Sequence, residues 1–262
     1  MNNTRETIAR LCKSMKLSAR MADNAMTITG KTNQEYLINL FQNEVNCRRK
    51  AMITKRMSEA RFPYEESFDE FDPHELVFSD DFSIEDCKDL TFLNEKRNIL
   101  MYGNPGTGKT MLSICIGIQA CLAGISVRFF HTESLISRLK EAHKEGRLTA
   151  FKEKHTSARI IILDEFGYIP YDPEGAQLLF NFVSDVYKKS SIIVTTNKEF
   201  SEWREILGDL KLTKAFTGRI IHKCELIVFP GEDRRISNSS ILKMYKSMMK
   251  DIDTAADLSE TM

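Results

Sequence analysis

Eight consecutive residues have the types and spacing needed to bind the phosphates of a nucleotide. They match the pattern Gly-x-x-x-x-Gly-Lys-Ser/Thr, in which glycines let successive backbone N–H groups converge on phosphate oxygens. Lys109 adds a positive charge for the β- and γ-phosphates, and the hydroxyl of Thr110 can ligate Mg²⁺. The predicted ATP-binding residues are Gly103, Asn104, Pro105, Gly106, Thr107, Gly108, Lys109 and Thr110.

Two adjacent carboxylates, Asp164 and Glu165, are the next candidates. They follow the apolar run 160–163, which predicts a buried strand, about 55 residues after the phosphate-binding loop. Asp164 would hold Mg²⁺, directly or through water, and Glu165 would activate the attacking water as a general base. Two neighbouring acids with different roles favour hydrolysis of the γ-phosphate, because a transferase would need an acceptor pocket.

Two further polar side chains could contact the γ-phosphate. Asn197 ends the apolar run 191–196, and its amide can hydrogen-bond the phosphate or the attacking water without adding charge. An ordinary turn residue is the alternative interpretation. Arg219 lies in a helix-like segment, and its forked donors suit the oxygens of a transferring phosphoryl group. A surface salt bridge is the alternative for this arginine.

Strand-like and helical segments alternate around these candidates. Continuous apolar runs occupy residues 98–102, 126–131, 159–163, 191–196 and 225–229. Runs of this kind are typical of strands buried on both faces of a parallel sheet. Their alternation with helical patterns predicts an α/β fold with helices on both faces of the sheet. Ligands bind outside the carboxyl ends of such strands, where the candidate residues are expected.

The first part of the chain has a different character. A long helix is predicted from Asn33 to about Ala60, with an apolar stripe through Leu37, Leu40, Phe41 and Val45. Pro63 ends this helix, and an acidic, aromatic-containing connector follows. We expect a helical N-terminal domain with the connector at 1–75, an ATPase domain at 76–250, and an acidic, disordered tail at 251–262.

Basic residues are unevenly distributed, although the chain has 37 Lys and Arg and 37 Asp and Glu. Residues 1–64 hold 12 basic and 5 acidic side chains, whereas residues 65–89 hold 11 acidic side chains. A basic segment can contact a nucleic-acid backbone, and a solvated helix face is the alternative. The candidate DNA-binding residues are Arg48, Arg49, Lys55 and Arg56 on the long helix, and Lys140, Lys144 and Arg147 on one face of a helix predicted within 132–154.

Other site types are not supported. The six cysteines are scattered without a Cys-x-x-Cys pair, so neither a zinc site nor a disulfide framework is predicted. No apolar run approaches the ~20 residues of a membrane-spanning helix, and the start lacks the apolar core of a signal peptide. We therefore expect no membrane partner and a cytoplasmic location.

Taken in order, the motifs resemble those of AAA+ ATPases of the initiator and helicase-loader group. Nearer still, the chain resembles the IstB-like transposition helper ATPases of bacterial insertion sequences. The resemblance rests on Gly-Asn-Pro-Gly-Thr-Gly-Lys-Thr at 103–110, Ile-Ile-Leu-Asp-Glu-Phe-Gly-Tyr-Ile-Pro at 161–170, Val-Thr-Thr-Asn at 194–197, Gly-Arg-Ile-Ile-His at 218–222, Ala-Arg-Phe-Pro-Tyr at 60–64 and Phe-Asp-Glu-Phe-Asp at 68–72.

This resemblance implies a five-stranded parallel sheet and a helical N-terminal domain that contacts DNA or a transposase. It also implies ring-like or spiral homo-oligomers on double-stranded DNA, with Arg219 reaching the nucleotide of a neighbouring subunit. Two positions depart from the family pattern: Gly218 stands where Asp is usual, and Asp233-Arg234-Arg235 stands where Ser-Tyr-Arg is usual. The resemblance therefore assigns no phosphate-sensing role to Arg234 or Arg235.

The motifs predict an ATPase that uses ATP and Mg²⁺, and the resemblance implies that it helps transposition. It would assemble on target DNA and recruit or activate the transposase, with hydrolysis as a release step. A replicative helicase loader has the same ATPase parts and is the first alternative. A nucleotide-dependent scaffold that does not hydrolyse ATP is the second alternative, and the presence of Glu165, Asn197 and Arg219 argues against it.

Overall fold

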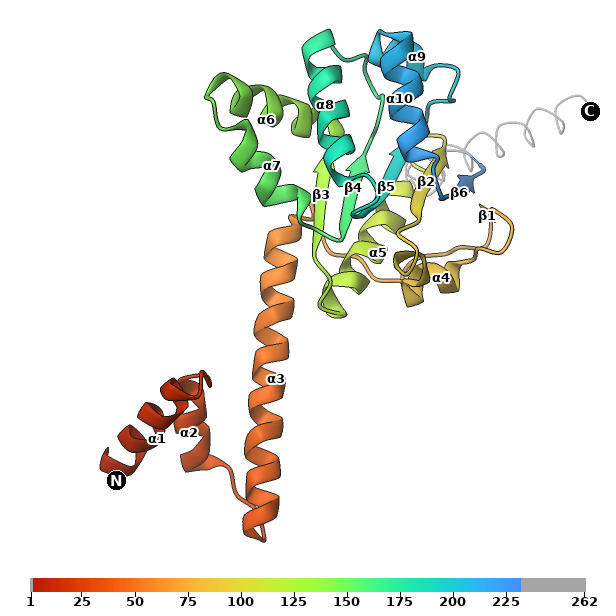
Figure 1. Ribbon diagram of the computed structural model, residues 1–262. Helices are drawn as coiled ribbons and strands as arrows, with labels where there is room; N and C mark the ends of the chain where they lie inside the picture. Colours follow the sequence, from red (N-terminus) through yellow and green to blue (C-terminus); the bar gives the residue numbers. More distant parts are fainter. Residues whose placement is uncertain (1, 232–262) are drawn as a thin grey trace, which may run out of the picture. The chain divides into compact units, whose positions relative to one another are not determined.

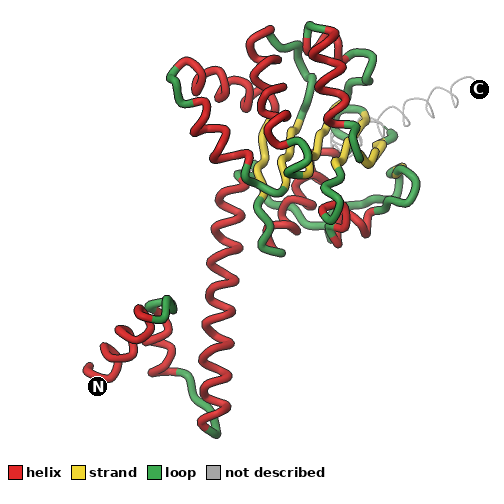
Figure 2. The backbone as a smooth tube through the Cα atoms, viewed as in Figure 1, coloured by secondary structure: helices red, strands yellow, loops and turns green. Residues whose placement is uncertain are grey.

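The computed structural model describes residues 2–231 of the chain, which divides between Ser58 and Glu59 into two compact units. Figure 2 shows that helices make up the first unit and that all strands belong to the second. The predicted tail at 251–262 lies outside the described residues, and so do Arg234 and Arg235. No helix within residues 2–231 has the length and apolar character needed to span a membrane.

The division falls earlier in the chain than residue 75, where the sequence placed it. The reason is that the chain packs within the second unit from Glu59 onward, before the connector begins. The ring of Phe62 makes an edge contact with Phe129 at 6.1 Å between centroids, and Arg128 pairs with Glu59 at 3.4 Å. The connector therefore belongs to the second unit.

The first unit contains α1 (Asn2–Ser14), α2 (Arg20–Thr27) and most of α3 (Asn33–Ala60). Its small core is formed by Cys12, Met21 and Leu40. A buried carboxylate joins the elements, because Glu44 of α3 accepts hydrogen bonds from the backbone N–H of Ser18 at 3.0 Å and from Arg48 Nε at 2.7 Å. The bounds of α3 agree with the predicted long helix, whereas α2 was not predicted.

The apolar stripe predicted on α3 is largely exposed. Leu40 is buried, but Leu37, Phe41 and Val45 are 48%, 49% and 57% exposed. Of the four residues of the predicted stripe only Leu40 is buried, because the small first unit covers only the part of α3 that carries it. The unit therefore presents large apolar side chains to solvent.

The second unit is built on a six-stranded sheet in the order β1-β6-β2-β5-β4-β3 (Figure 1). Five strands are parallel, and the two-residue β1 adds to the edge antiparallel to β6. The strands are β1 (Val77–Phe78), β2 (Asn98–Gly103), β3 (Val127–His131), β4 (Ile160–Asp164), β5 (Ser191–Thr196) and β6 (Cys224–Phe229). The predicted α/β class and the five-stranded parallel sheet are confirmed, and only the short β1 was missed.

Helices cover both faces of this sheet, as Figure 1 shows. One face carries α4 (Ile84–Asp89) and α5 (Lys109–Leu122), and a 3₁₀ turn, η1 (Thr91–Leu93), follows α4. The other face carries α6 (Thr132–Lys144), α7 (Leu148–Thr156), α8 (Pro173–Val186), α9 (Trp203–Leu207) and α10 (Leu210–Ile220). The large core on the second face includes Phe166, which stacks on Phe216 at 5.1 Å and packs against Trp203 at 4.7 Å.

The single helix predicted within 132–154 is two helices. Gly146 adopts a left-handed conformation with φ 68°, which ends α6 and lets the chain turn into α7. Arg147 therefore lies at the start of α7, not on the face of α6 that carries Lys140 and Lys144. The predicted common face of these three basic residues was wrong.

A buried amide ties the end of α10 to the sheet. The side-chain N–H₂ of Asn98, the first residue of β2, donates to the carbonyl oxygens of Arg219 at 3.1 Å and Ile220 at 2.9 Å. Its Oδ1 accepts from the backbone N–H of Ile192 in β5 at 2.8 Å. One side chain thus connects two strands and a helix, and a buried hydrogen-bond network of this kind fixes their relative positions.

Candidate nucleotide-binding site

Two of the three predicted catalytic residues, Glu165 and Asn197, line one cleft of about 930 Å³ at the carboxyl edge of the sheet. The phosphate-binding loop follows β2, Asp164 and Glu165 end and follow β4, and Thr195 to Asn197 end and follow β5. Because β4, β5 and β2 are neighbours in the parallel sheet, their carboxyl ends bring these segments together. Arg219 does not line this cleft.

Two glycines shape the phosphate-binding loop. Gly103 lies so close to β6 that an added Cβ would be 2.3 Å from the carbonyl oxygen of Phe229. Gly108 has φ 103°, a left-handed conformation that glycine adopts without strain, and directly precedes α5. The loop therefore reaches the amino end of α5, where backbone N–H groups and the helix dipole favour an anion.

The lysine of the loop is buried and held by the loop itself. Lys109 Nζ donates to the carbonyl oxygens of Gly103 at 2.7 Å and Asn104 at 2.6 Å. Thr107 donates its hydroxyl to the same Asn104 carbonyl oxygen at 2.8 Å, and the Asn104 side chain donates to the Gly231 carbonyl oxygen at 3.1 Å. These contacts keep the ammonium group at the loop, where a bound phosphate would be its next partner.

Asp164 is the most buried charged group of the cleft, with no exposed surface. Its Oδ1 accepts hydrogen bonds from the hydroxyls of Thr110 at 2.8 Å and Thr195 at 2.6 Å. Its Oδ2 has no hydrogen-bond partner among the described residues. Hydroxyl and carboxylate oxygens are hard ligands, so Thr110, Asp164 and a phosphate oxygen fit Mg²⁺ by their chemistry.

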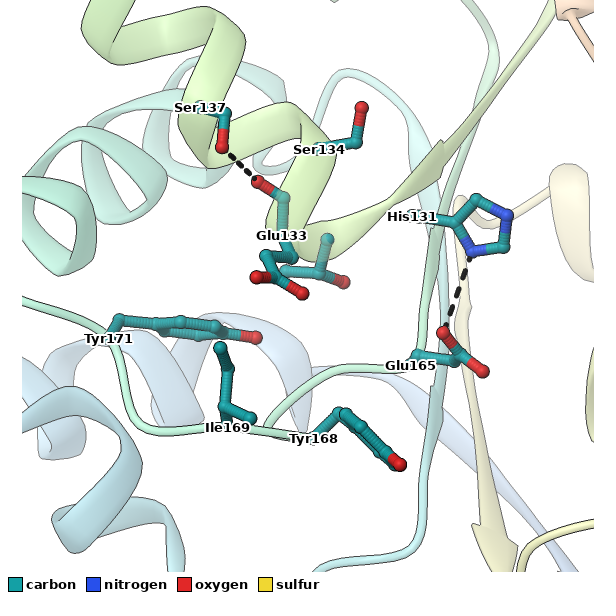
Figure 3. A pocket seen from close by; sticks show the side chains of 9 residues that line it. His131, Glu133, Ser134, Ser137, Glu165, Tyr168, Ile169 and Tyr171 are labelled. Atoms are coloured by element: carbon teal, nitrogen blue, oxygen red, sulfur yellow. Dashed lines mark hydrogen bonds and ion pairs between the residues drawn. The ribbon is translucent and has the colours of Figure 1, made fainter.

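Glu165 lines the same cleft as the phosphate-binding loop. Its side chain is 61% exposed, and its backbone is left-handed with φ 56°. The Thr195 hydroxyl accepts the Glu165 backbone N–H at 2.9 Å and so stabilises this strained turn. Figure 3 shows Glu165 and His131 pointing toward each other, with Tyr168 nearby, at a second cavity of about 480 Å³.

Asn197 lines the cleft and is half-buried, as a residue that contacts the γ-phosphate or its water should be. Arg219 instead folds back on its own subunit. Its Nη1 donates to the Ala215 carbonyl oxygen at 2.7 Å, and its guanidinium lies over Phe180 at 4.6 Å from the ring centre. Its Nε is buried without a hydrogen-bond partner among the described residues.

The acidic connector forms one wall of the cleft, which the sequence did not indicate. On this side the cleft is lined by Tyr64, Glu66, Glu70, Phe71 and Asp72. Phe71 is buried, and its ring would lie 3.5 Å from a Cβ placed on Gly108. Burial raises the pKa of Glu66, and the neighbouring Glu70 raises it further.

The candidate DNA-binding residues lie in different settings. Arg48 contacts Glu44 and donates to the Lys16 carbonyl oxygen at 2.8 Å, so it has a structural role in the first unit. Arg49 and Lys55 are exposed, and Arg56 is half-buried. Lys140 pairs with Asp172 at 2.8 Å, Arg147 pairs with Glu145, and Lys144 is exposed. Lys140 and Arg147 are therefore both paired with acidic side chains of this chain.

Three polar residues at the strand ends beside the cleft were not assigned from the sequence either: His131, Thr195 and Thr196. His131 is the last residue of a strand-like run, and a polar residue at that carboxyl end is the signal that could have identified it. Thr195 and Thr196 end β5 immediately before Asn197. Thr196 donates its hydroxyl to the Phe166 carbonyl oxygen at 2.8 Å, so it supports the turn after Glu165.

Comparison with known proteins gives matches along most of the chain. A sequence profile of the family described as IstB-like ATP binding protein matches residues 9–241. The chain is 34% identical over 203 residues to the ATP-binding protein of insertion sequence IS21 from Pseudomonas aeruginosa, covering 78% of this chain and 77% of that protein. It is 35% identical over 204 residues to the ATP-binding protein of insertion sequence IS232 from Bacillus thuringiensis subsp. berliner, covering 78% and 82%.

Among solved structures, the crystal structure of DnaI is similar in fold. It superposes with a TM-score of 0.51 at 16% sequence identity, covering 65% of this chain and 90% of that one. The identity is too low to compare site residues, so the likeness concerns the fold alone.

Proposed function

This chain belongs to the family of IstB-like ATP-binding proteins, and from this premise we propose that it is an ATP-hydrolysing, DNA-binding helper of insertion-sequence transposition. The observation that carries the proposal is the convergence of the phosphate-binding loop, Asp164, Glu165 and Asn197 on one cleft. The relatives are named as ATP-binding proteins of insertion sequences, which supports the transposition context.

In this proposal the phosphate-binding loop binds ATP. Backbone N–H groups at the start of α5 contact phosphate oxygens, and Lys109 moves its ammonium group from the loop carbonyls to the β- and γ-phosphates. Thr110 and Asp164 hold Mg²⁺, which neutralises negative charge on the phosphates when bound. The connector residues opposite the loop would exclude part of the bulk water from the cleft.

Hydrolysis depends on the exposed carboxylate of Glu165. It accepts a proton from the water that attacks the γ-phosphate, and the Asn197 amide orients that water by a hydrogen bond. The Glu165 side chain is 61% exposed, whereas that of Asp164 is fully buried, so the two acids can keep separate roles. The arrangement supports ATP hydrolysis over transfer to a second substrate.

The arginine of the site would come from a neighbouring subunit. Arg219 does not line the cleft of its own subunit, and its buried Nε lacks a hydrogen-bond partner among the described residues. In a ring or spiral homo-oligomer it would stabilise charge on the neighbour's γ-phosphate. ATP turnover would then require assembly, and assembly would take place on double-stranded DNA.

The first unit offers surfaces for DNA and for the transposase. Arg49 and Lys55 are exposed cations on α3 that can contact DNA phosphates. Leu37, Phe41 and Val45 are exposed apolar side chains on the same helix, and such a patch is typical of protein–protein contacts. We therefore assign contact with the transposase to this apolar part of α3.

A binding experiment tests the central claim. Affinity for double-stranded DNA is measured with ATP, with ADP and without nucleotide, at several salt concentrations. We expect binding at least about ten-fold tighter with ATP, a difference of about 1.4 kcal/mol, and a steep loss of affinity as salt rises. Lys109→Ala should remove the ATP effect. Equal affinity in all three nucleotide conditions would overturn the proposal.

The client protein is tested separately. The chain is mixed with the transposase encoded beside it and, in parallel, with a replicative helicase from the same organism. We expect ATP-dependent co-elution with the transposase and none with the helicase. Binding to the helicase alone would replace the transposition role by helicase loading while leaving the ATPase assignment intact.

A further inference from the structure

Three ligand atoms of the site face one another in an arrangement that ATP hydrolysis does not require. They are His131 Nδ1, Asp164 Oδ2 and one carboxylate oxygen of Glu165, and they all lie within 4.8 Å of one another. His131 Nδ1 is 3.3 Å from Asp164 Oδ2 and 3.8 Å from Glu165 Oε2. The register of β3 on β4 pairs His131 with Asp164, so the sheet itself sets this proximity.

The two oxygens of Asp164 have different surroundings. Oδ1 accepts hydrogen bonds from Thr110 and Thr195, whereas Oδ2 is buried and has no hydrogen-bond partner among the described residues. A buried charged oxygen without a hydrogen bond is unfavourable, so a ligand for it would be favoured. The imidazole beside it can supply a second donor atom to the same ligand.

The spacing suits a metal ion. Ligands about 2.1 Å from a metal are separated by about 3.0 Å in adjacent octahedral positions and by about 3.4 Å in tetrahedral ones. The observed separations of 3.3 Å and 3.8 Å need only a small rotation of the exposed Glu165 side chain. Thr110 lies on the opposite side of the carboxylate, at Oδ1.

We propose that His131, Asp164 and Glu165 form a second cation site, distinct from the Mg²⁺ position at Thr110, that binds a divalent transition-metal ion. One imidazole nitrogen with two carboxylate oxygens suits Mn²⁺, Co²⁺ or Zn²⁺ better than Mg²⁺, which prefers oxygen ligands. The cavity of about 480 Å³ shown in Figure 3 reaches His131 and Glu165, so an ion can enter without crossing the phosphate-binding loop.

Occupation of this site has a consequence for turnover, and this consequence alone rests on the proposed function. A Glu165 carboxylate that ligates a metal ion holds its charge on that ion and is a poorer acceptor for the proton of the attacking water. A transition-metal ion at the second site therefore inhibits ATP hydrolysis, and releasing it restores the base.

The site is tested with Mn²⁺ in nucleotide-free protein, in the presence of excess Mg²⁺. Pulsed electron paramagnetic resonance detects the coupling of the Mn²⁺ spin to a directly bound ¹⁴N. We expect this coupling in the native protein, its displacement by Zn²⁺, and its loss in His131→Gln with Mn²⁺ affinity weakened by on the order of 10- to 100-fold. His143→Gln, which changes an exposed histidine of α6, serves as the control and should keep the coupling.

Absence of ¹⁴N coupling in the native protein, or its persistence in His131→Gln, would overturn the second site. Folding of the variant is checked by its thermal unfolding midpoint, which should change little because the His131 side chain is 46% exposed. In a second arm, Zn²⁺ should inhibit ATP turnover of the native protein more than that of His131→Gln. A protein without any turnover would contradict the proposed function but not the metal site, and equal inhibition would contradict the inhibitory role.

Discussion

At the scale of single residues, Glu165 combines exposure with backbone strain. Its φ of 56° places a non-glycine residue in the left-handed region, which is uncommon and is found where function or surrounding contacts demand it. If Glu165 is the general base, Glu165→Gln should lower ATP turnover by about 10²- to 10⁴-fold and leave ATP binding intact. Turnover and nucleotide affinity are measured together to separate the two effects.

The matched control for this change is Glu133→Gln. Glu133 is also exposed and lines the cavity of Figure 3, but it does not line the cleft with the phosphate-binding loop. Its replacement should leave turnover within about two-fold of the native value, as is usual for surface positions. Turnover of Glu165→Gln at the native rate would remove Glu165 as the base.

Thr195 is the residue on which both acids depend. Its hydroxyl donates to Asp164 Oδ1 and accepts the Glu165 backbone N–H. Thr195→Val should therefore lower the unfolding free energy by about 1–3 kcal/mol, since buried polar groups lose their partners. It should also lower turnover more than nucleotide affinity. Thr195→Ser keeps the hydroxyl, and a failure of this variant to recover turnover would show that the methyl group matters instead.

At the scale of elements, the connector places negative charge where an anion is proposed to bind. Glu66, Glu70 and Asp72 line the same cleft as Lys109. The carboxylates of the connector would repel the phosphates of ATP bound in the same cleft. The double change Glu66→Gln and Glu70→Gln should therefore tighten ATP binding several-fold, up to about ten-fold or 1.4 kcal/mol. Titration with a fluorescent ATP analogue measures the dissociation constant.

Glu65→Gln is the control for this experiment. Glu65 is an exposed neighbour in the connector and does not line the cleft. An equal gain in affinity from Glu65→Gln would mean that net charge, and not position in the cleft, governs binding. No gain from the double variant would contradict a repulsive role of the connector.

The helix α7 carries a histidine that makes stability depend on pH. Burial and the nearby Arg138 lower the pKa of His155 from its ordinary 6.5 to about 4. Its ring packs against Phe151 at 4.6 Å and Phe130 at 5.4 Å. The folded protein disfavours the charged form of His155. The contribution of neutral His155 to the free energy of unfolding is therefore present above pH 6.5 and is lost as pH falls from 6.5 toward 4.

A shift of this size corresponds to about 3 kcal/mol. We therefore expect the thermal unfolding midpoint of the native protein to fall between pH 6.5 and pH 4, and to fall less steeply in His155→Phe. The slope with pH is the readout, because the variant can also change the midpoint at neutral pH. His143→Gln, at an exposed position, should keep the native slope.

The sequence predicts elements well where the signal is local. All five parallel strands and α3 are continuous in pattern, and their bounds agree with prediction to within about one or two residues. The two-residue β1 depends on pairing with β6 far along the chain, so no local pattern announces it. Gly146 is a local signal for the end of a helix, but the helix predicted within 132–154 continues through it.

The candidate site divides in the same way. Residues after strand ends, such as Asp164 and Asn197, can be placed by the rule for parallel sheets. The position of the connector against Gly108 could not be predicted in this way. It depends on the packing of Phe71, which is far from the phosphate-binding loop in the sequence. The burial of Leu40 with exposure of its neighbours likewise depends on the small size of the first unit.

At the scale of the whole molecule, the proposed site is incomplete within one subunit. Arg219 contacts Phe180 and Ala215 of its own chain and does not line the cleft. If it acts on a neighbour, Arg219→Ala and Lys109→Ala should each be inactive alone. Mixing them should restore part of the turnover, because some interfaces then pair an intact arginine with an intact phosphate-binding loop. Turnover that stays at the sum of the separate variants would contradict a shared site.

The hydrogen bonds made by the Asn98 side chain bear on how such a shared site could work. Because the amide of Asn98 holds the carbonyl oxygens of Arg219 and Ile220 against the sheet, the backbone at Arg219 has a fixed position. The guanidinium, by contrast, is joined to that backbone by rotatable bonds and rests on aromatic rings. The backbone of Arg219 is thus held in place while its side chain can rotate. If Arg219 acts on a neighbouring subunit, as proposed, its guanidinium could move there by rotation about side-chain bonds, while the backbone hydrogen bonds to Asn98 stay in place.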